Sequence, residues 1–156
     1  MQNLNYNDLI IEGMIFIKNT EYEKALSIFK KAIEKNKLHT KAYINLANTY
    51  ILIKNINSST KTLFDYLQEY GFNKEIADYL GEICLNFNLE SELLKLFEIS
   101  NLNSTKLHEN RDNIFFIQGK YYEKNKKFKS AIVSYKNSIK CNNIFIKSYL
   151  NLFKLL

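Results

Sequence analysis

A period of 34 residues runs through this chain and constrains its fold more than any other feature. One series of positions holds a small residue in every copy, at Gly13, Ala47, Gly81 and Gly119. A second series in the same register holds large residues, at Phe29, Leu63, Phe97 and Tyr135. A third series is Ala25, Ser59, Leu93 and Ala131. Within each series the intervals are 34, 34 and 38 residues. Such self-similarity, with one shared insertion, indicates stacked copies of a single unit.

Each unit has the pattern of two packed helices. Apolar residues recur at helical spacing, as at Tyr43, Leu46 and Tyr50, and the alternation typical of strands is absent. Helices whose axes lie about 8 to 10 Å apart need small residues where they cross. Gly13 with Ala25 meets that need in the first unit. The sequence therefore predicts an all-α chain built from helix pairs.

These positions resemble the tetratricopeptide repeat (TPR) family, whose unit of 34 residues pairs two antiparallel helices. Six signature positions match in the first repeat: Gly13, Phe16, Tyr22, Ala25, Phe29 and Ala32. Seven match in the fourth: Phe115, Gly119, Tyr122, Phe128, Ala131, Tyr135 and Ser138. The middle repeats match less fully, and no repeat closes with the family's proline.

The resemblance implies a right-handed superhelical solenoid of about four TPR units plus a terminal helix. We expect one domain over residues 1–156, with repeats at 6–39, 40–73, 74–107 and 112–145 and a terminal helix at 145–156. The four-residue insertion falls in the polar stretch NLNSTKLHENR, residues 101–111, which we expect to be a loop or a loosened helix end. Thr20 and Glu23, three residues apart, predict a capping box at the start of the second helix.

The sequence shows no targeting signal and no membrane-spanning segment. The first residues, MQNLNYNDLIIEG, lack a basic region and a cleavage site. No apolar run approaches the roughly 18 to 20 residues that a span requires. We therefore expect a cytoplasmic protein with no membrane partner.

Catalytic and metal-binding motifs are also absent. Cys84 and Cys141 are isolated, and His39 and His108 have no partners at ligand spacing, so we expect reduced, packing cysteines and no cofactor or metal. No phosphate-binding loop, dinucleotide fingerprint or nucleophile motif occurs. Glu75, Asp78 and Glu82 share a helical face, and we interpret them as an acidic patch facing solvent or a partner rather than a cation site. No enzyme is expected.

Partner binding in TPR proteins uses a concave groove lined by the first helix of each pair. Carrying the groove positions over gives the expected peptide contacts Ile44, Asn45, Asn48, Glu75, Asp78, Glu82, Phe116 and Lys120, with Ile10, Met14 and Asn113 beside them. A clamp for a C-terminal carboxylate is disfavoured, because only Asn45 fits its pattern. The charge is also divided: residues 62–101 have a net charge of −6 and residues 102–156 have +8. We expect an interaction scaffold that selects an oriented peptide or helix of another protein.

The chain ends on an apolar segment, IFIKSYLNLFKLL. In the repeat register Tyr149, Leu152 and Leu156 pack back on the preceding pair, and Ile146, Leu150, Phe153 and Leu155 lie on other faces. Two interpretations stand with equal weight. The segment is either a terminal helix that meets another protein, including a second copy of this chain, or a repeat cut short. Self-association is assigned to Ile146, Leu150 and Phe153.

Two alternatives to a peptide scaffold remain. The first is a self-associating subunit of a larger complex, since the last third faintly resembles TPR subunits of the anaphase-promoting complex. The second is nucleic-acid binding through KNKKFK, residues 124–129, in a chain with net charge +6 and one arginine, Arg111. Nucleic acid is disfavoured, because Phe128 occupies a TPR core position and should not be free to stack on bases.

Overall fold

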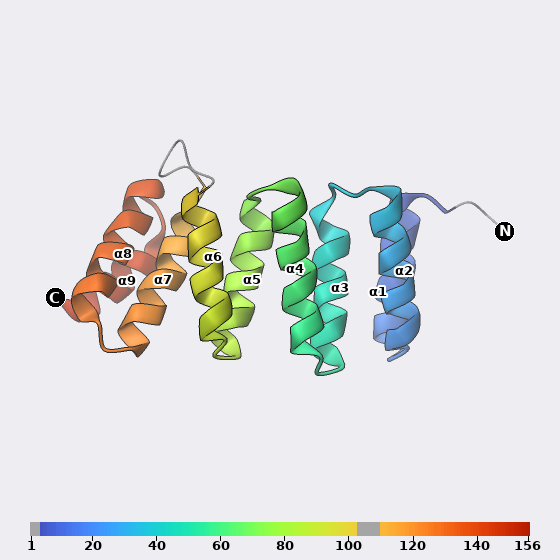
Figure 1. Cartoon of the computed structure of the whole chain (residues 1–156), viewed down its shortest axis with the longest axis horizontal. Coiled ribbons are helices and arrows are strands. Elements are labelled where there is room, and N and C mark those ends of the chain that lie inside the picture. The colour runs from blue at the N-terminus through green and yellow to red at the C-terminus, as the bar shows by residue number, and fades with distance from the viewer. Residues whose placement is uncertain (1–3, 103–109) are drawn as a thin grey trace. The chain divides into compact units, whose positions relative to one another are not determined.

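The computed structural model describes residues 4–102 and 110–156, and within those ranges the chain forms nine helices and no strands (Figure 1). The predicted all-α class of antiparallel helix pairs followed by a terminal helix is confirmed. The chain divides into two compact units, Met1–Gly71 and Phe72–Leu156. The single domain expected from the sequence stays a prediction. No helix in the described part is long and apolar enough to cross a membrane.

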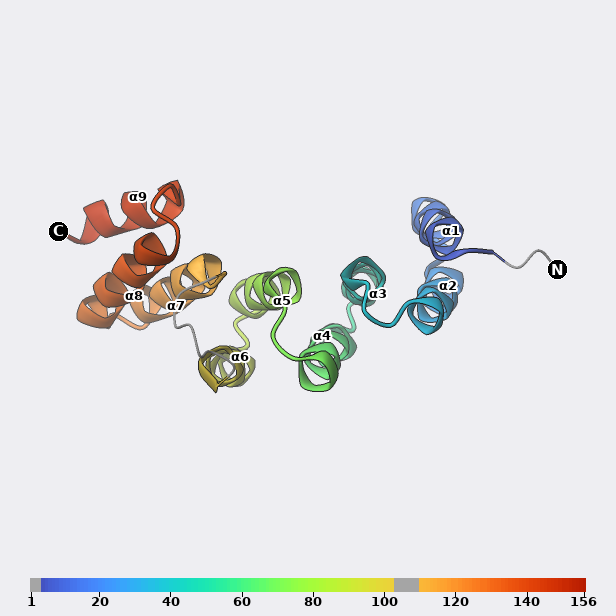
Figure 2. The same cartoon turned by 90° about the horizontal axis from the view of Figure 1, so that it is seen from above.

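The first unit contains two helix pairs. They are α1 (Tyr6–Lys18) with α2 (Tyr22–Lys35), and α3 (Thr40–Leu52) with α4 (Ile56–Tyr70). Packing runs from α1 to α2, from α2 to α3 and from α3 to α4 (Figure 2). Gly13 and Phe29 show why small and large residues recur at fixed intervals. A Cβ on Gly13 would lie 2.4 Å from the Phe29 ring, which is fully buried. The glycine therefore gives the aromatic ring the space it occupies.

The second unit contains two more helix pairs and a ninth helix. Its helices are α5 (Lys74–Asn86), α6 (Glu90–Leu102), α7 (Asp112–Lys124), α8 (Phe128–Cys141) and α9 (Ile146–Leu155). α8 packs on α7 on one side and on α9 on another. Gly119 and the fully buried Tyr135 repeat the first unit's pair, since a Cβ added to Gly119 would again lie 2.4 Å from the ring. The first and fourth repeats therefore share the same local geometry.

The turns inside the four pairs share one backbone motif. Thr20, Lys54, Asn88 and Lys126 all have positive φ, between 57° and 62°. After each of them, an N–H reaches back to the carbonyl five residues earlier, as from Glu21 to Phe16 at 2.9 Å and from Lys127 to Tyr122 at 2.8 Å. This is the Schellman ending of a helix, in which one left-handed residue satisfies carbonyls that the helix leaves unpaired. The turn thus keeps the register of the repeat.

The capping box expected at Thr20 and Glu23 is wrong. The N-cap of α2 is Glu21, and no side chain caps the helix there. Thr20 instead supplies the left-handed residue of the preceding turn, and its hydroxyl donates to the Asn19 carbonyl. The true capping box lies at the start of α1, where Asn5 and Asp8 exchange hydrogen bonds. The spacing of Thr20 and Glu23 alone does not show that Thr20 belongs to the turn that ends α1.

Replacing Thr20 by glycine is expected to raise the free energy of unfolding by about 1 kcal/mol, because a β-branched residue is strained at positive φ and glycine is not. Urea unfolding followed by circular dichroism measures the change. Ser27→Gly, in the interior of α2, should lower the same free energy by about 0.5 kcal/mol. Equal destabilisation by both changes would contradict the strain at Thr20.

The predicted loop at residues 101–111 can be followed only in part. α6 ends at Leu102 and α7 begins at Asp112. The inserted residues lie mostly within 103–109, outside the described residues. Arg111, just after them, is buried: its Nε donates a hydrogen bond to the Ser100 carbonyl at 2.7 Å, and its guanidinium lies 4.3 Å from the centre of the Phe72 ring. The single arginine therefore joins α6, α7 and the segment before α5.

Candidate functional site

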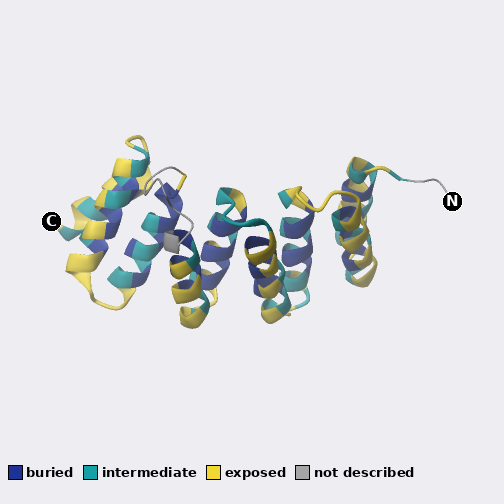
Figure 3. Cartoon of the chain, turned by 45° about the horizontal axis from the view of Figure 1, so that its top comes forward, coloured by how far each residue is buried: buried dark blue, intermediate teal, exposed yellow. Residues whose placement is uncertain are grey.

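An apolar strip lies along α1 in the first unit. Ile11, Met14 and Ile15 are exposed, and Ile11 keeps 60% of its surface in contact with solvent. Their spacing places them on one helical face. The sequence-based groove position Ile10 is wrong, because its side chain is buried in the core cluster with Leu26. The exposed face of α1 therefore keeps the expected Met14 but contains Ile11 in place of Ile10. Figure 3 colours the helices by burial.

The first helix of the second pair, α3, begins beside α1. The ring of Tyr6 lies 4.5 Å from the ring of His39, the N-cap of α3. Ile44, Asn45 and Asn48 are partly buried on α3. The Nδ2 atom of Asn45 is buried, and none of the described residues accepts a hydrogen bond from it. An unpaired buried amide costs about 1 to 3 kcal/mol, so this donor would gain from a new acceptor.

The acidic patch predicted on α5 is divided by an ion pair. Glu75 and Glu82 are exposed, whereas Asp78 is partly buried and pairs with Lys74 at 3.2 Å. Lys74 also pairs with Asp112 of α7 at 2.5 Å, and Asn142 donates to Asp112 at 3.2 Å. Burial raises the pKa of Asp78 to about 6, although Lys74 opposes the change. Burial also acts on Asp112, but hydrogen bonds from Lys74 and Asn142 outweigh it and lower the pKa of that carboxyl.

The partly buried Asp78 gives a pH-dependent prediction. A carboxyl whose pKa is raised on folding holds its proton longer in the native state, so stability falls as the pH rises from 3.8 to about 6. Asp78→Asn removes this contribution. The free energy of unfolding of the variant, minus that of the natural sequence, should increase by about 1 kcal/mol between these pH values, because the carboxyl keeps some contact with water. Urea titrations at several pH values measure it; a difference that does not change with pH would contradict the assignment.

Phe116 and Lys120 on α7 are less available than expected. The Phe116 ring is partly buried and lies 5.9 Å from the ring of Tyr135 and 5.6 Å from that of Phe145. Lys120 pairs with Glu123 at 3.6 Å. The expected groove residue Asn113 is buried and belongs to the interior. Among the predicted positions of this unit, Glu75 and Glu82 are therefore the charged groups most open to a partner.

Helix α9 shows an uncovered apolar face. Ile146, Leu150 and Phe153 expose 70%, 59% and 84% of their surfaces. Two residues expected to pack back on α8, Tyr149 and Leu156, are exposed instead. The helix is turned so that Ser148 is fully buried and its hydroxyl donates to Ser138 of α8 at 2.6 Å.

That rotation of α9 also moves its leucines. Leu152 is partly buried, as expected, but Leu155, placed on another face by the repeat register, is partly buried as well. The small, fully buried Ser148 and its hydrogen bond to Ser138 place this face of α9 against α8.

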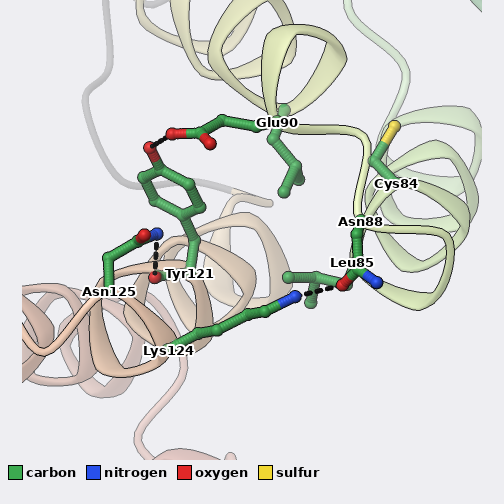
Figure 4. Close-up of a pocket in the computed structure, with 8 residues that line it drawn as sticks. Cys84, Leu85, Asn88, Glu90, Tyr121, Lys124 and Asn125 are labelled. Atoms are coloured by element: carbon green, nitrogen blue, oxygen red, sulfur yellow. Dashed lines mark hydrogen bonds between the residues drawn. The ribbon is translucent and has the colours of Figure 1, made fainter.

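A small cavity of about 120 Å³ lies in the second unit between the α5–α6 turn and the end of α7 (Figure 4). Its polar groups satisfy one another: Tyr121 donates to Glu90, and Lys124 donates to Asn88. Burial raises the pKa of the Cys84 thiol in its wall to about 12, which leaves it protonated and a poor nucleophile. The described residues contain no group of three side chains able to hold a metal ion. The cavity therefore offers no visible catalytic arrangement.

Phe128 contradicts its sequence-based assignment. It was expected in the core, but it is half exposed, with 50% of its surface in water. It is the first residue of α8, directly after a turn rich in lysine, so it lies beyond the crossing of α7 and α8. The match of Phe128 to a core position of the family did not reveal that the first turn of α8 lies away from the core. Phe128 is therefore open to contacts at the surface.

No protein-family model matches the sequence, and no curated protein matches it. Several solved structures share its fold. MamA aligns with a TM-score of 0.66 at 15% identity, over 96% of this chain and 80% of MamA. Pseudomonas aeruginosa pilF aligns with a TM-score of 0.68 at 18% identity, over 97% of this chain and 67% of pilF. YrrB, a TPR protein with an unusual peptide-binding site, aligns with a TM-score of 0.50 at 16% identity, over 95% of this chain and 74% of YrrB. At these identities the likeness is one of fold.

Proposed function

We propose that this chain, which has the fold of the tetratricopeptide-repeat proteins, is a protein-interaction scaffold that binds an extended peptide or a helix of a partner and has no catalytic activity. The observation that carries the proposal is the exposed apolar strip of α1, formed by Ile11, Met14 and Ile15. The same unit holds Asn45, whose amide nitrogen has no acceptor among the described residues. A peptide offers both missing parts, a carbonyl acceptor and apolar side chains. The expected compartment is the cytoplasm, and no cofactor is required.

The first unit offers a binding surface for apolar side chains of a partner. Ile11, Met14 and Ile15 would bury apolar side chains of the partner, and each large side chain covered contributes roughly 1.5 to 3 kcal/mol. Asn45 and Asn48 would bind the partner's backbone through their amides. The peptide-binding site of YrrB supports such a use of this fold.

The second unit has a separate proposed surface, on which charge would select the partner. Glu75 and Glu82 are exposed on α5 and would favour a basic segment of the partner. Asp78 contributes less, since Lys74 already neutralises it. Phe116 would contact the partner only through the part of its ring that the neighbouring aromatic residues leave open.

Selection from a library of displayed random peptides tests the proposal, followed by calorimetry with the selected peptides. Asn45→Leu should lower the affinity at least tenfold while leaving the free energy of unfolding unchanged or raised, because the buried amide loses no partner within the protein. Asn57→Leu, at an exposed position of α4, is the matched control and should leave affinity unchanged. Selection of no peptide, or equal affinity for both variants, would overturn the assignment.

Charge selection is tested with the same peptides. Glu75→Lys together with Glu82→Lys should weaken binding of basic peptides and lower its dependence on salt. These exposed positions are better targets than Asp78, whose replacement by lysine would disrupt the pairing with Lys74.

A second candidate function is self-association through α9, as in a subunit of a larger complex. The exposed Ile146, Leu150 and Phe153 favour it, because an apolar face of this size is usually covered. Light scattering after size exclusion should give a dimer for the natural chain and a monomer for Leu150→Asp with Phe153→Asp. Val133→Asp, at an equally exposed apolar residue of α8, is the control. A monomer at every concentration would remove this candidate.

A further inference from the structure

The outer face of α8 and the turn before it form a continuous basic surface. Residues 124–141 contain six lysines and no aspartate or glutamate. Lys129, Val133, Lys136 and Lys140 are exposed and spaced by four, three and four residues, which places them on one face of the helix. Lys126, Lys127 and Phe128 extend this face at the start of α8. We call these seven residues the α8 lysine stripe.

The charge of the α8 lysine stripe is not neutralised within the part of the chain that the structure describes. Lysines elsewhere form ion pairs there, among them Lys24, Lys61, Lys74 and Lys120. None of the five stripe lysines pairs with a described residue. The acid that precedes them, Glu123, accepts from the Tyr135 hydroxyl and pairs with Lys120. Since like charges on one helical face repel, a partner of opposite charge would relieve a repulsion that the fold leaves in place.

Two apolar side chains stand within the stripe. Phe128 is half exposed at one end, and Val133, with 57% of its surface exposed, lies among the lysines of the helix. α8 packs on α7 and α9 through other faces, so the stripe lies on the outer surface of this unit (Figure 3). A partner that matched charge alone would leave both side chains in water.

We propose that the α8 lysine stripe adsorbs to the surface of a lipid bilayer that carries anionic headgroups. Such a surface is negatively charged and broad, so lysines along the roughly 20 Å of α8 can approach it together. Its interface also accepts shallow apolar side chains, as Phe128 and Val133 require. The proposal departs from the expectation of no membrane partner, which came from the lack of a spanning segment. It does not depend on the proposed peptide-binding function.

Single-stranded nucleic acid fits the stripe less well. Such binding combines a basic groove with several aromatic side chains on which successive bases stack. The stripe lies on an outward helical face, has one aromatic residue and contains no arginine. Val133 has no partner in that arrangement, whereas a bilayer interface gives it one.

Cosedimentation with phosphatidylcholine vesicles, with and without phosphatidylserine, tests the proposal on the full chain. The protein should bind only the vesicles that contain phosphatidylserine, and less at high salt. Each lysine near the surface raises partitioning about fivefold, so Lys127→Glu, Lys129→Glu and Lys136→Glu together should lower it at least about a hundredfold. Phe128→Ala should lower it about tenfold.

The matched control reverses three exposed lysines of the first unit, Lys30→Glu, Lys31→Glu and Lys37→Glu. Three reversals take the formal net charge from +6 to 0 in either variant, so a difference between them reports position rather than total charge. Equal loss in both variants, or no binding of the natural chain, would overturn the proposal. Binding of single-stranded RNA at low salt without binding of vesicles would overturn it in favour of nucleic acid.

Discussion

Phe29→Ala should lower the free energy of unfolding of the first unit by about 3 to 5 kcal/mol. Phe29 is fully buried and fills the space above Gly13, with Ala25 and Ala32 in the same core. Alanine would leave a cavity there, because the opposite wall is a glycine with no side chain to move into it. Urea unfolding followed by circular dichroism measures the loss.

Two companion variants sharpen this test. Phe29→Leu keeps most of the apolar volume and should cost less than half as much as alanine. Phe128→Ala, at the half-exposed aromatic of α8, should change stability by no more than about 0.5 kcal/mol. A small loss for Phe29→Ala would mean that the core at Gly13 closes around the gap.

Gly119→Ala should lower the free energy of unfolding by about 1 to 3 kcal/mol, even though alanine is the better helix former. The added Cβ would lie 2.4 Å from the ring of Tyr135. That ring cannot withdraw easily, since the Tyr135 hydroxyl donates to Glu123 at 2.6 Å and the ring is fully buried. The overlap must therefore be relieved by separating α7 from α8.

A double-mutant cycle distinguishes this overlap from other causes. Tyr135→Leu alone should be destabilising, but Gly119→Ala should cost little in that background, because the smaller side chain leaves room for the methyl group. The measurement is again urea unfolding of all four proteins. Additive effects would mean that Gly119 is required for a reason other than the Tyr135 ring.

The fold followed from the sequence to the extent that it depends on local periodicity. The Gly13–Phe29 and Gly119–Tyr135 pairs could be predicted because small and large residues recur at fixed intervals in the sequence. Packed helices require a small residue opposite a large one. The errors fell where a residue's role depends on neighbours at the edge of a helix. Thr20 matched a capping pattern but was taken by the preceding turn, and Phe128 matched a core position but lies in the first turn of α8.

The candidate site was predicted less well than the fold. Exposed positions such as Glu75 and Glu82 follow from the helical face they share. The pairing of Lys74 with both Asp78 and Asp112, 38 residues from Lys74, was missed because it joins two helices that only packing brings together. A lysine four residues before Asp78 was a signal that could have indicated part of it. The unpaired amide of Asn45 had no signal in the sequence.

By itself the sequence determined that this chain is a series of helix pairs with one period, since small and large residues alternate at intervals that only stacked helices can use. Tertiary structure alone decided which faces remain open. Helix α9 is rotated about its axis so that Ser148 contacts Ser138 of α8. In this orientation Tyr149 and Leu156 are exposed to solvent. The physical reason is that a rotation of one residue costs nothing in helix formation, and the fit against a neighbouring helix selects among the possible faces.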